Sequence, residues 1–185
     1  MGIGRRRGAG AGAGAFGGSV GVAVVGAVTV VALAAGCSPQ DSGGSRADRQ
    51  GSVAERGESV MPFDLERTTH RFTATATGGV QDVVADRRGD TRQIDLIRVH
   101  LREEAEAFGR GDFGDPAAIH GADMPGLAEL RAGHDRIEVR YTERTDGATL
   151  TYTTRDSALV DALHDWFAAQ LGDHGAHAES GHGSR

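Results

Sequence analysis

Apolar and polar residues alternate in two pairs of short stretches, as they do in half-buried β-strands. The first pair is "THRFTATAT" (69–77) and "VQDVVAD" (80–86), and the second is "RIEVRYTE" (136–143) and "ATLTYTT" (148–154). Gly78-Gly79 separates the first pair and Asp146-Gly147 the second. Glycine supplies the positive φ that tight hairpin turns need. The pattern therefore predicts two β-hairpins, with their turns at these glycines.

Two longer segments repeat their apolar residues at helical spacing instead. The first, 91–108, follows Asp90, and the second, 158–171, follows Asp156 and Ser157; all three are residue types that cap helices well. The apolar faces consist of Ile94, Ile97, Leu101, Ala105 and Phe108 in the first segment, and Val160, Leu163, Phe167 and Leu171 in the second. A shift of 66 positions superposes the two faces. Each hairpin and the helix after it therefore form one β-β-α unit.

Together these elements predict an α+β domain. Each apolar helix stripe must be buried against another layer. We expect a two-layer sandwich, in which a four-stranded, mostly antiparallel sheet carries both helices on one face. A long insert, 109–133, joins the two units, and Pro125 favours a short helix within it. Connectors of this length with little regular structure are uncommon unless they are functional.

The first 36 residues have the pattern of an export signal. Three arginines, residues 5–7, precede the apolar run Val20 to Ala35, which ends in small residues before Cys37. "LAAGC" also resembles a bacterial lipobox, in which the cysteine becomes the lipidated first residue. We therefore predict a signal peptide over 1–36 and a lipid on Cys37 that holds the protein at the extracytoplasmic face of the cell membrane. The alternative is an uncleaved anchor, although the run is shorter than the about 20 residues of a typical span.

The two ends of the exported chain lack apolar periodicity. Residues 37–60 are polar and rich in glycine and serine, which predicts a flexible tether after the lipid. Residues 173–185 predict a disordered tail, whose His174, His177 and His182 could bind metal ions loosely. The folded domain is then expected over 61–172.

The charge and the single cysteine exclude several classes of function. The chain has 26 acidic residues and 20 basic ones, all arginine, for a net charge of −6. Because nucleic-acid binding needs clustered positive charge, we do not expect nucleic acid as a partner. Once Cys37 is lipidated, no thiol remains for a disulfide, a metal-binding thiolate or a nucleophile.

A candidate metal site combines the first helix with the insert. His100 and Glu104 lie one turn apart on the helix. If the insert folds back over this helix, His120 and Met124 of "IHGADMPG" can join them. Imidazole and carboxylate suit zinc or Cu(II), and an added thioether favours Cu(I). We therefore predict a copper, zinc or small-ligand site at the insert (112–126) from these four residues. Alternatively, the helix face is simply solvated and Met124 fills a gap in the core.

Enzyme motifs are absent from the chain. It contains no nucleophile elbow, phosphate-binding loop or dinucleotide fingerprint. Asp112 and Asp115 could act as an acid–base pair, but aspartates beside glycine and proline more often turn the backbone. The sequence therefore favours a binding protein over an enzyme. A membrane-tethered protein-interaction module without metal is the second hypothesis.

From Met61 to about Ala178 the chain resembles a family of small actinobacterial proteins of undetermined function. The resemblance lies in "TTHRFT", "GGVQ", "GDFGDPAAIHGADMPGL" and "DWFAAQLGDHGAHA". Some members carry the label aspartate carbamoyltransferase, an enzyme with two α/β domains and a Ser-Thr-Arg-Thr phosphate loop. This chain has no such loop, so we do not predict that activity. The resemblance implies a domain that begins near Met61, with the leader as an addition.

Overall fold

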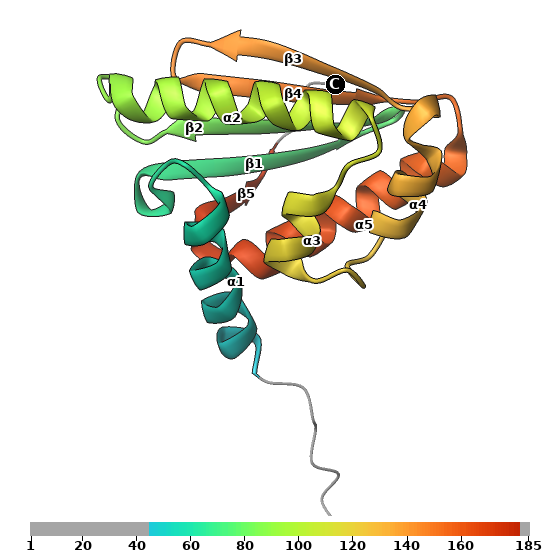
Figure 1. Ribbon diagram of the computed structural model, residues 1–185, viewed down its shortest axis with the longest axis horizontal. Helices are drawn as coiled ribbons and strands as arrows, with labels where there is room; N and C mark the ends of the chain where they lie inside the picture. The colour runs from blue at the N-terminus through green and yellow to red at the C-terminus, as the bar shows by residue number, and fades with distance from the viewer. Residues whose placement is uncertain (1–44, 182–185) are drawn as a thin grey trace, which may run out of the picture. The chain divides into compact units, whose positions relative to one another are not determined.

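The computed structural model describes residues 45–181, which form five α-helices and five β-strands (Figure 1). In chain order these are α1 (Arg46–Val60), β1 (Thr68–Thr75), β2 (Gly78–Ala85), α2 (Thr91–Gly109), α3 (Gly114–His120), α4 (Leu127–Gly133), β3 (Glu138–Arg144), β4 (Gly147–Thr153), α5 (Ser157–His174) and β5 (Ala178–Ser180). The expected signal peptide, the lipidation site Cys37 and His182 lie outside the described residues. Within 45–181, no helix is both long and apolar enough to span a bilayer.

The strands form one mixed sheet in the order β3-β4-β2-β1-β5. Both predicted hairpins are present, as the antiparallel pairs β1–β2 and β3–β4, and β2 pairs with β4 to join them. The α+β class is therefore confirmed, but the expected four-stranded sheet was wrong. The fifth strand, β5, pairs in parallel with β1, with His70 opposite Ala178. Without β5, β1 would be an edge strand with unpaired backbone N–H and C=O groups. The segment after α5 pairs with some of these groups.

Both hairpin turns lie earlier than the glycines suggested, the first by two residues and the second by one. Thr75 pairs with Gly78 across the first turn, so Ala76 and Thr77 form it and Gly78 begins β2. Gly79 is needed for packing instead. A Cβ atom there would stand 2.3 Å from the Phe167 ring of α5, closer than any real contact. This glycine lets α5 approach the sheet directly.

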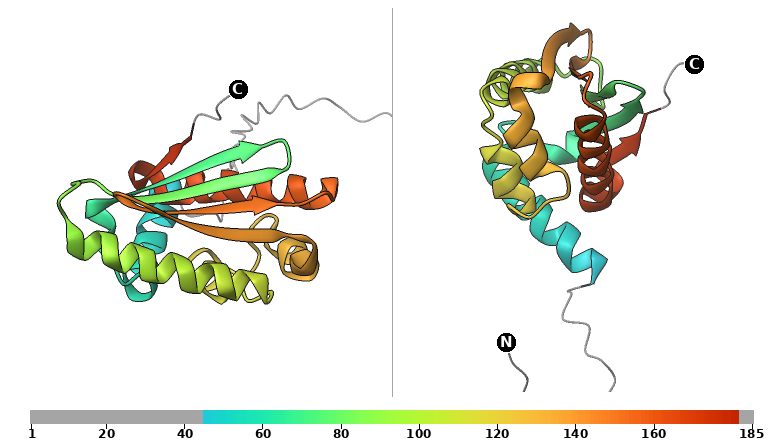
Figure 2. Two further views of the ribbon diagram at one scale, coloured as in Figure 1. Left: turned by 90° about the horizontal axis from the view of Figure 1, so that it is seen from above. Right: turned by 90° about the vertical axis from the view of Figure 1, so that its right-hand side faces the viewer.

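Helices α2 and α5 cover the same face of the sheet. Figure 1 shows α2 in front of the strands and α5 below them, and in the view from above the strands lie over α5 (Figure 2). Inward-facing residues of the strands, such as Phe72, Val83 and Leu150, are buried in one apolar core with both helices. The opposite face carries a row of partly exposed threonines on β4, Thr149, Thr151 and Thr153. The strands and these two helices thus share one core.

The segment expected to be a flexible tether forms helix α1 from Arg46 onward. Ser45 and Asp48 cap its first turn reciprocally. Only one large apolar side chain of the helix, Val53, is fully buried, and polar side chains donate hydrogen bonds to the ends of α3 and α5. Because one apolar residue leaves no visible periodicity, the sequence pattern did not reveal this helix.

The disordered tail was predicted to begin at residue 173, but regular structure continues beyond that residue. Asp173 and His174 complete the last turn of α5, and the chain continues through a short 3-10 turn into β5. The structured domain therefore extends at both ends beyond the expected limits of 61–172.

Candidate functional site

Three histidines from distant parts of the chain gather beneath the sheet. His70 lies in β1, His120 is the last residue of α3, and His174 is the last residue of α5. The ring centroids of His70 and His174 are 5.3 Å apart with parallel planes, and those of His120 and His174 are 4.9 Å apart, edge to face. We call these three residues the histidine cluster.

Local sequence explains how each element presents its histidine. His70 alternates with Thr68 and Phe72 on the inward face of β1, so its side chain must enter the core. Helix α3 stops after His120 because Gly121 has φ +100°, which residues with a Cβ rarely adopt. Helix α5 stops after His174 in the same way, at Gly175 with φ +56°. Two helix ends and one strand therefore meet at a single point.

A small cavity lies at this meeting point. Its volume is about 10 Å³, close to the space that one water molecule or ion requires. Besides the histidine cluster it is lined by Met61, Phe72, Gln81, Glu104, Pro116, Ile119 and Gln170. The lining thus combines imidazole, carboxyl, amide and thioether groups inside the domain.

The histidines of the cluster are neutral at physiological pH. Burial, together with the neighbouring imidazoles, lowers the pKa of His70 to about 4 and that of His174 to about 2. Burial also lowers the pKa of His120, against the opposing effect of Asp173. The Nδ1 atom of His70 is buried and has no hydrogen-bond partner among the described residues. A neutral imidazole carries the lone pair that binds metal ions.

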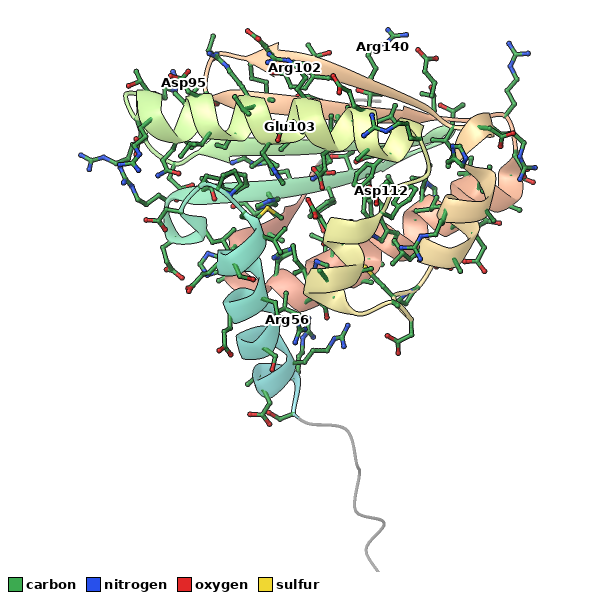
Figure 3. All side chains as sticks on the ribbon, in the orientation of Figure 1. Arg56, Asp95, Arg102, Glu103, Asp112 and Arg140 are labelled. Carbon is green, nitrogen blue, oxygen red and sulfur yellow. The ribbon has the colours of Figure 1, made fainter. Side chains whose placement is uncertain are left out.

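The fourth ionisable group of the cavity, Glu104, is also held in its neutral form. Burial, aided by the charge of Asp115, raises the pKa of Glu104 to about 8. Its neighbour on α2, Glu103, points to solvent, where Figure 3 shows it on the outer surface of the helix. The carboxyl group of Glu104 is therefore mostly protonated at neutral pH, and it lines the same cavity as the three neutral imidazoles.

A charged pair supports the cluster from outside the cavity. Asp173 Oδ2 lies 3.0 Å from His120 Nδ1, and the same carboxylate accepts hydrogen bonds from Arg49 Nε at 2.6 Å and Arg49 Nη2 at 2.8 Å. These contacts lower the pKa of Asp173 despite its burial. The carboxylate of Asp173 is therefore ionised, and both of its oxygens have hydrogen-bond partners.

The structure brings together two of the four residues expected to bind metal. Glu104 and His120 line the same cavity. His100 packs instead against the Phe63 ring, at a centroid distance of 5.6 Å, and its buried Nε2 has no hydrogen-bond partner in the part of the chain that the structure describes. Met124 is 3% exposed and belongs to the apolar core. Within residues 45–181, no three His, Cys, Asp or Glu side chains are already arranged to hold one metal ion.

Sequence reasoning missed His70 and His174. The sequence does contain a signal for each, because His70 shares the inward face of its strand with Phe72, and His174 is one helical turn after Gln170 and two turns after Phe167. His174 was instead assigned to a disordered tail. Met61, at the expected start of the domain, lines the cavity in place of Met124.

Comparison of the chain with protein-family models, with curated proteins and with solved structures finds no match in any of the three. The functional argument therefore depends on the geometry and chemistry of the cavity.

Proposed function

We propose that this protein is a membrane-tethered, extracytoplasmic binding module for a transition-metal ion, copper or zinc, and that the histidine cluster with Glu104 is its site. The observation that carries this proposal is the convergence of three neutral imidazoles, from three separate elements, on one ion-sized cavity.

The spacing of the rings supports the proposal. Two imidazoles bonded to one zinc ion, at N–metal distances of about 2.0–2.1 Å, place their ring centroids roughly 5 Å apart. The two ring pairs of the cluster have separations of 4.9 and 5.3 Å. Ligation then requires rotation of the imidazoles about their side-chain bonds, because the rings of His70 and His174 are parallel in the structure.

Glu104 can supply the negative charge that a buried cation requires. An ion entering the cavity would displace the carboxyl proton, because a neighbouring cation lowers the pKa of an acid. Metal binding should therefore release protons, as it does where ligands must first be deprotonated. Without such a charge, transfer of a divalent ion into this buried cavity would be unfavourable.

The location outside the cytoplasm and the lipid on Cys37 belong to the same proposal and depend on the leader sequence. A tether would hold the site near the membrane, where the module meets exported ions or partners. The resemblance to small actinobacterial proteins implies no activity for this chain, and the carbamoyltransferase label has no support in its motifs.

The test is a titration of the full chain with Zn(II), Cu(II) and Cu(I), followed by thermal unfolding. A ligand at a hundredfold excess over its dissociation constant stabilises the folded state by about 2.7 kcal/mol. We expect His120→Gln and His174→Gln to abolish this stabilisation, and His134→Gln, outside the cavity, to retain it. Loss of stabilisation in His100→Gln and Met124→Leu would instead identify the site expected from the sequence.

Absence of stabilisation by all three ions in the parent chain would reject the metal site. The protein-interaction module would then become the leading hypothesis, to be tested by identifying proteins that copurify with the membrane-bound chain and depend on its folded domain.

A further inference from the structure

The last residue of α3 is held in one orientation by a carboxylate from α5. Asp173 Oδ2 lies 3.0 Å from His120 Nδ1, and both side chains are almost completely buried. An ionised carboxylate can only accept hydrogen bonds. His120 Nδ1 must therefore carry the hydrogen, and the lone pair of this neutral ring is on Nε2.

The carboxylate is itself held by a residue from the N-terminal helix. Arg49 of α1 donates from Nε to Asp173 Oδ1 at 2.6 Å and from Nη2 to Asp173 Oδ2 at 2.8 Å. This is the bidentate arrangement in which arginine binds carboxylates most strongly. The ion pair keeps Asp173 charged, since an unpaired carboxylate at this depth would tend to take up a proton.

Helix α1 also fixes the two helix ends that carry His120 and His174. The final carbonyl groups of a helix have no partner within it. Arg49 Nη2 donates to His120 O at 3.3 Å, Arg56 Nε to Ile119 O at 2.6 Å, and Gln50 Nε2 to Gly172 O at 2.9 Å. Arg56 and Arg49 thus make similar bonds to the end of α3, but only Arg49 also binds Asp173. Figure 3 shows Arg56 on α1 near α3.

We propose that Asp173, held by Arg49, is the positioning residue of the site, and that it fixes His120 as the Nδ1–H tautomer so that Nε2 is the atom offered to the metal. The inference rests on the proposed function in that His120 serves as a ligand. It makes α1 a structural part of the site. Carboxylates that hold metal-binding imidazoles in this way raise metal affinity by about 10–100-fold.

The first measurement reads the tautomer without any metal. Long-range ¹H–¹⁵N spectra of the metal-free full chain distinguish the protonated from the unprotonated ring nitrogen of His120. We expect Nδ1–H in the parent chain and in Arg56→Gln, and a substantial Nε2–H population in Asp173→Asn. A parent chain with Nε2–H would overturn the proposal, even if no variant can be purified.

The second measurement is the affinity for zinc of the same proteins. We expect Asp173→Asn to bind about 10–100-fold more weakly, Arg49→Gln to bind more weakly with Arg49→Lys restoring part of the loss, and Arg56→Gln to stay near the parent value. If Arg49 and Arg56 only held α1 against α3, Arg56→Gln and Arg49→Gln would lower the zinc affinity to the same extent. Equal losses of affinity in the two variants would therefore overturn the positioning role.

The two measurements separate the two proposals. If the parent binds no zinc but has the Nδ1–H tautomer, and Asp173→Asn loses it, then Asp173 positions His120 and the metal function alone is rejected. If the parent binds zinc and His120 keeps its tautomer in Asp173→Asn, the positioning role is rejected and the metal function stands.

Discussion

The domain contains two buried regions of opposite chemistry, one aromatic and one made of histidines. The aromatic region consists of Phe108, Phe113, Tyr152 and Trp166. Phe108 and Phe113 stack at 4.6 Å, and Trp166 meets Phe108 edge to face at 5.8 Å. Such contacts stabilise the fold through apolar burial and favourable ring geometry. The histidine cluster is buried nearby but consists of titratable imidazoles. Each region contains one buried polar atom without a hydrogen-bond partner among residues 45–181, His70 Nδ1 in the cluster and Trp166 Nε1 in the aromatic region.

This difference indicates which region holds the fold and which is available for function. Burial of several ionisable groups in place of apolar side chains costs free energy, so a fold does not need such a cluster for stability. Glu104 lies between the two regions, because it lines the cavity of the histidine cluster and a second cavity beside Phe108. The following predictions test the contrast.

Removal of an aromatic ring should cost the most stability. Trp166→Ala deletes a side chain that is 1% exposed, and such deletions lower the free energy of unfolding by about 3–5 kcal/mol. Denaturant unfolding at pH 7 measures the loss. By contrast, His174→Gln should change the stability of the metal-free chain by only about 1 kcal/mol, because it removes at most the one neutral hydrogen bond between His174 Nε2 and Gln170 Oε1. Equal losses in the two variants would remove the distinction between the regions.

Acid should destabilise the protein through the histidine cluster. The pKa of His70 is about 4 in the folded chain and 6.5 in the unfolded one, so between these values only the unfolded chain binds the proton. Stability from this group is complete above pH 6.5 and is lost at about 1.4 kcal/mol per pH unit as the pH falls to 4. Stability measured from pH 7.5 to 4 should have a shallower acid limb in His70→Phe than in the parent or in His134→Phe.

A rise in pH should lower the stability of the protein through Glu104, which is the opposite of the effect of His70. Its pKa of about 8, against 4.5 in the unfolded chain, means that the folded chain holds a proton which the unfolded chain has lost. Stability therefore falls by about 1.4 kcal/mol per unit as the pH rises from 4.5 to 8. Glu104→Gln should lack this slope and become more stable than the parent as the pH rises.

The matched control for this carboxyl group is its exposed neighbour. Glu103→Gln should leave the pH profile of stability unchanged, because that side chain is solvated in both states. Parallel profiles for the parent and Glu104→Gln would show that Glu104 is ionised in the folded chain and would weaken its assignment to the site.

The smallest effect is expected at the start of α1. Ser45→Ala removes the side chain that accepts from Asp48 N, and such caps contribute about 1 kcal/mol. Because one apolar residue and a few polar bonds attach α1, we expect faster amide hydrogen exchange in α1 of the variant with little change in the sheet. Uniformly faster exchange throughout the domain would mean that α1 unfolds only with the whole domain.

The amino-acid sequence by itself determined the hairpins, the two long helices and their caps. Asp90 accepts from Gln93 N and Asp156 from Ala158 N, as the N-cap pattern predicted. These features could be read because alternation, helical spacing and capping depend on residues close together in the chain. The residues of α2 that face the core, including Ile97 and Leu101, were found for the same reason.

Only the tertiary structure decided the fifth strand, the attachment of α1 and the candidate site. β5 pairs with β1 across more than a hundred positions, and Arg49 meets Asp173 across 124. The cavity requires the sheet, two helix ends and α2 to be in place together, and no local pattern records which histidines will meet. Met124 and His100 illustrate the same limit, because apolar packing placed one in the core and the other against Phe63. Contacts between distant segments depend on how the layers pack, and that packing brought His70 and His174 to His120.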